Sequence, residues 1–240
     1  MRLDKYLTSV GLGTRSTVKK ILKQKRVKVF EQIVTDGKFQ LDETTAKVTV
    51  DDELLSYQKN HYYMLNKPKG YVSATKDPTE KTVLDLLDVP EKKQLFPVGR
   101  LDKDTTGLLL ITDDGELSHT LLSPRHHVSK TYTALIAGVV TEKTCATFSE
   151  PMLLKNGEQT KPAKLIVKEA DQNTKRSKIK ITITEGKYHQ IKRMFGAVGM
   201  KVLELKRIQM GPLELDHSLK KGQYRPLTET ELAKLHHETL

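Results

Sequence analysis

The segment GRLDKDTTGLLLIT, residues 99–112, ends in a run of four consecutive aliphatic residues, Leu108 to Ile111, followed by one threonine. A short apolar run of this kind, bounded by polar turns, is typical of a buried strand. Two carboxylates, Asp102 and Asp104, lie just before the run and close to Arg100. The segment therefore predicts a core strand whose entrance carries either a solvated turn or a reactive acid.

Three interpretations of the two acids are open on the residues alone. The first is a polar turn before a core strand, with no chemistry. The second is a glycoside hydrolase in which Asp102 and Asp104 act as a pair, because residues at i and i+2 share a face when the segment is extended. The third is a single catalytic aspartate on a loop, held by Arg100 or another cation.

The chain beyond residue 60 alternates between strand and helix patterns. Strands are expected over 61–66, 107–112, 129–138, 163–170, 177–186 and 202–210. Helices are expected near 82–87, over 116–123 and 187–198, and from Thr228, where Glu231 completes a capping box. Mixed strand lengths without strict βαβ repetition favour an α+β fold, built on a mixed and largely antiparallel sheet flanked by helices.

The first 30 residues hold most of the positive charge of the chain. They carry nine basic side chains against one acid, while the whole chain has a net charge of +11. An excess of this size favours a polyanionic partner, and nucleic acid before membrane. A merely solvated helix usually interleaves acids, so the one-sided charge argues for a binding surface. Six side chains are expected to bind this nucleic acid: Arg2, Arg15, Lys19, Lys20, Lys23 and Arg26.

The same region combines two short helices with a small sheet. Helical spacing of apolar residues predicts a first helix from Leu3, ending near Gly11 or Gly13. Thr14 is a candidate N-cap for a second helix, whose outer side is expected to carry the basic residues up to Arg26. Short strands are expected over 26–30, 39–42 and 47–51. The polar segment 54–60 then predicts a linker.

This N-terminal region resembles the S4 RNA-binding domain. The resemblance rests on RLDKYL at the start, TRSTVKKILKQKRVKV from helix to strand, and VTVDDEL at the end, and it covers about residues 1–55. It departs where Phe30-Glu31-Gln32 stands in place of the Asn-Gly often found after the strand. We expect an S4-like module over 1–56 and a larger domain over 61–240.

A third constellation lies in EGKYHQIKRMF, residues 185–195. Its apolar residues form one helical stripe, while His189, Lys192 and Arg193 are spaced to share the opposite flank. Three groups able to carry positive charge near a helix start suit an anion or a carboxylate. A solvated helix face remains the alternative on these residues alone.

Taken together and in this order, the segments resemble the pseudouridine synthases, and among them the RsuA-type branch that modifies ribosomal RNA. The matching segments are NKPKG at 66–70, GRLD at 99–102 with the Thr-x-Gly and strand after it, the Lys130-x-Tyr132 pair, and EGKYHQIKRMF. The resemblance spans about residues 61–225. It implies isomerisation of a specific uridine, most simply in 16S ribosomal RNA.

The resemblance also assigns roles. Asp102 would act as nucleophile at C1′ or as base at C2′, Tyr132 would stack on the uracil, and Lys192 would pair with the aspartate. Asp104 would be a loop residue without a catalytic role. Four further side chains would bind the substrate: Arg100, His189, Arg193 and Lys67.

Other readings and partners complete the expectations. A synthase for 23S ribosomal RNA, a non-catalytic S4-type assembly factor and a base-releasing glycosidase are the alternatives. The reaction needs no cofactor or metal, and the His126-His127 and His236-His237 pairs lack ligand spacing. The lone Cys145 is expected to be buried in a helix, and a single cysteine fits a reducing compartment, so we expect a cytoplasmic protein. We also expect a monomer whose partner is ribosomal RNA, free or within an assembly intermediate. No membrane partner is expected.

Overall fold

The computed structural model describes residues 1–43, 45–55, 60–123 and 125–238. The chain divides into two compact units, residues 1–60 and residues 61–240, and each is described by itself. Within the described residues, no helix is both long enough and apolar enough to cross a membrane.

The N-terminal unit packs two helices on a small antiparallel sheet. The helices are α1 (Leu3–Ser9) and α2 (Arg15–Lys23). The strands are β1 (Val27–Val29), β2 (Gln32–Ile33), β3 (Val48–Val50) and β4 (Glu53–Leu54), in the order β2-β1-β3-β4. The apolar stripes of both helices are buried against this sheet, and the Thr14 side chain caps α2 by accepting from the Thr17 backbone N–H, as expected.

Three expectations for this unit are wrong in detail. The expected strand at 39–42 is reduced to an isolated bridge between Gln40 and Arg2. Arg26 lies after the end of α2 rather than on its outer side. The expected linker starts too early, because Leu54 belongs to β4 and the Leu55 N–H donates to the Val48 carbonyl at 2.8 Å; its positions 56–59 lie outside the described residues.

The hairpin between β1 and β2 turns through two residues with positive φ. Phe30 has φ 46° and Glu31 has φ 67°, and Val29 pairs directly with Gln32. A two-residue hairpin turn of this kind favours Asn-Gly, because β-carbon-bearing residues are strained at positive φ. Phe30 and Glu31, which stand in place of Asn-Gly, therefore form the same two-residue turn but with added backbone strain.

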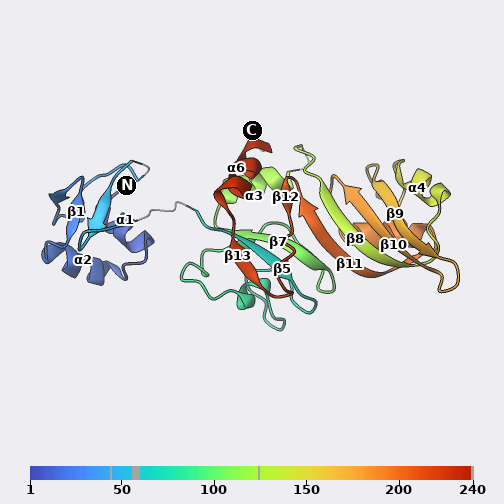
Figure 1. Ribbon diagram of the computed structural model, residues 1–240, viewed down its shortest axis with the longest axis horizontal. Helices are drawn as coiled ribbons and strands as arrows, with labels where there is room; N and C mark the ends of the chain where they lie inside the picture. Colours follow the sequence, from blue (N-terminus) through green and yellow to red (C-terminus); the bar gives the residue numbers. More distant parts are fainter. Residues whose placement is uncertain (44, 56–59, 124, 239–240) are drawn as a thin grey trace. The chain divides into compact units, whose positions relative to one another are not determined.

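The second unit is built on a nine-stranded sheet (Figure 1). Its strands are β5 (Tyr62–Lys67), β6 (Phe96–Pro97), β7 (Thr106–Thr112), β8 (Lys130–Ala137), β9 (Lys164–Asp171), β10 (Arg176–Ile183), β11 (Lys201–Met210), β12 (Leu213–Glu214) and β13 (Tyr224–Pro226). Its helices are the 3-10 helix η1 (Val83–Leu86) and the α-helices α3 (Gly115–Leu122), α4 (Glu142–Phe148), α5 (Gln190–Ala197) and α6 (Glu229–Glu238).

The main strand order is β13-β5-β7-β11-β8-β10-β9, with β6 paired to β7 and β12 paired to β11. Among the described strands, only β7 and β11 pair in parallel. The expected α+β class with a mixed, largely antiparallel sheet is therefore confirmed.

Burial patterns explain why neighbouring strands have such different sequences. Every residue of β5 and β7 is buried, because α3 and α6 pack on one face and the η1 region packs on the other. Figure 1 shows α3 and α6 together near the C-terminus. Strand β10 instead alternates lysine with isoleucine, which is typical of a sheet covered on one face only. The aliphatic run of β7 thus marks the centre of the fold.

Gly107 allows the parallel pairing of β7 with β11. It has φ +99°, and a β-carbon at this position would lie 2.1 Å from the Arg207 carbonyl oxygen. No other residue type fits such a close approach of two backbones. The glycine therefore fixes β11 beside the loop that carries Asp102.

Candidate active site

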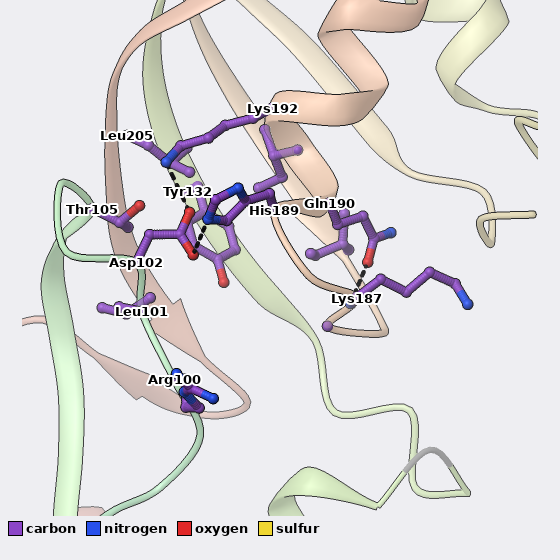
Figure 2. A pocket seen from close by; sticks show the side chains of 13 residues that line it. Arg100, Leu101, Asp102, Thr105, Tyr132, Lys187, His189, Gln190, Lys192 and Leu205 are labelled. Carbon is purple, nitrogen blue, oxygen red and sulfur yellow. Dashed lines mark hydrogen bonds and ion pairs between the residues drawn. The ribbon is translucent and has the colours of Figure 1, made fainter. Parts of the chain in front are cut away.

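Asp102 lies in the loop between β6 and β7, where two side chains from the α5 region meet its carboxylate. The Lys192 ammonium is 2.9 Å from Oδ2, and His189 Nε2 is 3.4 Å from Oδ1. Figure 2 shows these groups converging at the mouth of a pocket. Asp102 and Lys192 are each 25% exposed, so both remain accessible from the pocket side.

The Lys192 ammonium serves both acids of the loop. It also lies 2.6 Å from Oδ1 of Asp104, whose side chain is 68% exposed. Burial alone would lower the pKa of Lys192, but hydrogen bonds to Asp104 and Asp102 outweigh it and raise that pKa. The pKa of Asp104 is lowered in turn, since its bond to Lys192 overcomes partial burial. Lys192 is therefore a fixed cation at neutral pH.

Lys67 lies beneath the loop rather than in the pocket, so its expected role in substrate binding is wrong. The side chain is fully buried at the end of β5. Its ammonium donates to the backbone carbonyls of Asp102 at 3.0 Å, Thr105 at 2.9 Å and Pro68 at 3.2 Å. Because these partners are main-chain atoms, Lys67 fixes the shape of the loop and does not reach a substrate.

Two further residues, Ser73 and Gly70, hold the same loop. Ser73 Oγ donates to the Leu101 carbonyl at 2.9 Å and accepts from the Leu101 N–H at 3.0 Å. The Gly70 N–H donates to the Lys103 carbonyl at 2.8 Å. The chain on both sides of Asp102 is therefore anchored, which holds its carboxylate in one place.

The pocket beside Asp102 has a volume of about 70 Å³ and combines apolar walls with polar groups at its mouth. Tyr132 on β8 and Leu205 on β11 line it, with Ile183 and Ile191. Thr105 also lines it, and its buried hydroxyl has no hydrogen-bond partner among the described residues. Thr105 was not singled out from the sequence, because threonine in a loop carries no signal of its own.

His189 reaches Asp102 through an unusual backbone conformation. It precedes α5 as the N-cap residue with φ 49° and ψ 32°, so the helix begins at Gln190 and not at residue 187 as expected. The exposed Tyr188 ring stacks on the imidazole at 3.8 Å between centroids. The His189 ring therefore stacks on an exposed aromatic ring while its Nε2 lies near the Asp102 carboxylate.

The other two expected substrate-binding residues have different positions. Arg193 turns away from Asp102 and pairs with Glu158 at 2.6 Å, and it is absent from the described lining of the pocket. The expectation that Arg193 faces one region with His189 and Lys192 is wrong, because its guanidinium forms an ion pair with Glu158, an acid distant in the sequence. Arg100 is exposed and lines the pocket.

The basic residues of the N-terminal unit fall into two groups. Arg2 pairs with Asp4 at 2.5 Å, and Arg26 pairs with Asp51. The other four are exposed on α2 and form no ion pair among the described residues. We call them the α2 basic face: Arg15, Lys19, Lys20 and Lys23.

The remaining candidates from the sequence contribute little to the site. Cys145 lies on α4 as expected but is half-buried rather than buried, and burial raises the pKa of its thiol. His127 Nδ1 lies 2.8 Å from the Lys161 ammonium. Within the described part of the chain, no three His, Cys, Asp or Glu side chains are placed to hold a metal ion.

Comparison with known proteins identifies the class that this fold and site define. Residues 61–197 match the RNA pseudouridylate synthase family, and residues 1–45 match the S4 domain. The chain belongs to the RNA pseudouridylate synthase family, and it is therefore an isomerase.

Individual relatives cover nearly the whole chain. A Bacillus subtilis protein, described as an uncharacterized RNA pseudouridine synthase, is 45% identical over 97% of both chains. The ribosomal small subunit pseudouridine synthase A of Escherichia coli is 44% identical over 98% of this chain and 100% of its own. A crystal structure of a pseudouridylate synthase matches with a TM-score of 0.68 and 43% identity, over 98% of this chain and 99% of that one.

Proposed function

We propose that this enzyme converts one specific uridine of 16S ribosomal RNA into pseudouridine, with Asp102 as its catalytic residue. The observation that carries the proposal is the Asp102 carboxylate, which is anchored through its backbone and held by Lys192 at the mouth of a pocket lined by Tyr132. The small-subunit substrate is supported by the relatives in Escherichia coli and Haemophilus influenzae that are named for it.

The geometry suits the bond changes of the reaction. The N1–C1′ bond breaks, the uracil turns, and C5 bonds to C1′, so the site needs a carboxylate near C1′ and a place that retains the free base. Asp102 supplies the carboxylate, as nucleophile at C1′ or as base at C2′. Tyr132 supports the base by stacking, and the Thr105 hydroxyl, which has no partner in the part of the chain that the structure describes, offers it a hydrogen bond.

The lysine partner keeps Asp102 in its reactive form. An ammonium at 2.9 Å favours the ionised carboxylate, because opposite charges stabilise each other in a partly desolvated site. A single ammonium shared with Asp104 leaves one oxygen of Asp102 to His189 at 3.4 Å, which is a weak contact. That oxygen is the less tightly held of the two, and we assign to it the reaction with the substrate.

RNA recognition is assigned to the N-terminal unit. The α2 basic face contacts the phosphate backbone, and the target uridine turns out of the RNA into the pocket, since its C1′ is otherwise covered by neighbouring bases. Arg100 is exposed at the mouth of the pocket and contacts the turned-out nucleotide.

The test compares Asp102→Asn with Asp104→Asn on ribosomal RNA. Asparagine keeps the shape of the loop but can neither attack nor accept a proton, so the first variant loses activity by about 10⁴-fold or more. The second variant keeps most activity, because Asp104 is exposed and only shares Lys192. Pseudouridine is mapped in both 16S and 23S ribosomal RNA, and RNA affinity is measured by filter retention.

Each contrary outcome points to one alternative. An active Asp102→Asn enzyme removes the central role of this residue. A folded but inactive Asp104→Asn enzyme restores the paired-carboxylate mechanism. Modification in 23S ribosomal RNA replaces the substrate, free uracil among the products indicates a glycosidase, and RNA binding without pseudouridine in the wild-type protein indicates an assembly factor.

A further inference from the structure

A second and larger cavity adjoins the pocket of Asp102. Its volume is about 480 Å³, within the range that small-molecule sites occupy. Tyr132 and Arg100 line both cavities, so a nucleotide in the first lies next to the second. The charged residues that line the second cavity are Arg100, Lys130, Lys161, Lys187, Arg207 and a single acid, Glu185.

Two of these cations are buried in the sheet. Arg207 on β11 is 2% exposed and stands directly opposite Tyr132 of β8, and Lys130 of β8 is 8% exposed. The Arg207 Nε–H donates to the Leu108 carbonyl at 2.8 Å, while the buried Nη2 has no partner among the described residues. The Lys130 ammonium donates to the Val128 carbonyl at 2.8 Å, which uses one of its three protons.

No carboxylate among the described lining residues forms an ion pair with Arg207 or Lys130. Oε1 of Glu185 accepts from the Lys161 backbone N–H and from Gln190 Nε2, each at 2.7 Å. Burial, with help from the nearby Arg207 charge, lowers the pKa of Lys130 to about 8. Buried cations without a counter-charge are costly, so they usually have a negatively charged partner.

We propose that this cavity binds a phosphate group of the RNA strand next to the target uridine, with Arg207 and Lys130 as its ligands. The inference rests on the proposed function, because it places the nucleotide of the substrate in the adjoining pocket. A phosphate oxygen would accept from the free protons of both side chains. Binding there would hold the ribose of the turned-out uridine over Asp102 and would make the positioning of C1′ depend on the backbone of the RNA.

Inorganic phosphate is the probe for the site, measured by calorimetry on the full-length protein at constant ionic strength. Arg207→Gln and Lys130→Gln should each weaken binding about tenfold or more, since each removes a charge-assisted hydrogen bond. Lys206→Gln is the matched control: Lys206 neighbours Arg207 on β11 but lines a cavity on the opposite face of the sheet. It should bind phosphate as the wild type does. If Arg207→Gln fails to fold, Arg207→Lys replaces it; because lysine keeps the charge but lacks the planar fork of donors, a smaller loss of phosphate affinity is then expected.

The RNA arm distinguishes a backbone phosphate from a free anion. If the site takes the RNA backbone, inorganic phosphate weakens ribosomal RNA binding to the wild type and has a smaller effect on Lys130→Gln. A wild-type protein that binds no phosphate, equal loss in Lys206→Gln, or phosphate that binds without weakening RNA overturns the proposal. Because binding is measured without turnover, a failure to form pseudouridine would leave this result readable on its own.

Discussion

The fully buried Lys67 allows a prediction with a definite pH dependence. Burial lowers the pKa of its ammonium from 10.5 to about 8. Each unit of pKa difference between the folded and unfolded states corresponds to about 1.4 kcal/mol, so the charged form costs the fold about 3 kcal/mol. Between pH 8 and pH 10.5 the unfolded chain holds a proton that the folded chain has lost. The free energy of unfolding therefore rises with pH across this range, by about 3 kcal/mol in all.

Lys67→Met keeps a similar volume and removes the titrating group. We expect the variant to lack this rise, so its stability relative to the wild type falls as the pH increases from 8 to 10. Its activity should fall about a hundredfold, because the loop of Asp102 loses its main support and small displacements at a reacting centre are costly. Urea unfolding followed by circular dichroism at pH 7.5, 8.5 and 9.5 checks the stability, and pseudouridine mapping checks the activity.

Lys103→Met is the matched control, since Lys103 is in the same loop but exposed and paired with Glu80 at 2.7 Å. Its unfolding free energy should follow the wild-type dependence on pH. The buried Lys130, whose pKa is also about 8, contributes equally to all three proteins and cancels in the comparison. Identical pH slopes for Lys67→Met and the wild type would refute the reasoning.

Three other outcomes are expected. Replacing all four residues of the α2 basic face with glutamine should reduce the slope of log affinity for RNA against log salt concentration by roughly 3, because each lost phosphate contact removes about 0.7–0.9. Arg26→Gln should change this slope less, because Asp51 already neutralises that charge. Tyr132→Phe should keep RNA affinity, since stacking of ~1–3 kcal/mol survives loss of the hydroxyl, whereas Tyr132→Ala should lose turnover more than affinity. If Tyr132→Phe binds RNA as poorly as Tyr132→Ala in filter retention, stacking is contradicted. Phe30→Asn with Glu31→Gly should raise the stability of the N-terminal unit by about 1 kcal/mol in thermal unfolding, and a less stable protein would show that the turn is not strained.

Sequence patterns predicted the elements whose burial is regular. The aliphatic run of β7, the alternation of β10 and the capping box of α6 are all found as expected, because each is set by local periodicity or a local hydrogen bond. The two-residue strands β2, β4, β6 and β12 are too short to show a period. The position of β11 between β7 and β8 was not predicted, since pairing of distant strands leaves no local signal.

The residues of the site likewise fall into those that the sequence predicted and those that it did not. The resemblance to a known family brought Asp102, Tyr132 and Lys192 forward, and the structure places them around one pocket. Lys67 was misjudged because its partners are backbone carbonyls, which have no sequence signature. Arg193 was misjudged because its position depends on Glu158, an acid from a separate part of the chain.

The order of the strands sets when this enzyme can become active during its synthesis. Asp102, Tyr132 and Lys192 all precede β11, yet β11 is the strand that joins β7 to β8. A nascent chain released only as far as residue 197 would hold these groups on two separate ribbons, each with an open edge. The final strand, β13, must still return to cover the edge of β5. The chain therefore acquires its active site only after β11 and β13 have emerged, although none of these three groups lies on either strand.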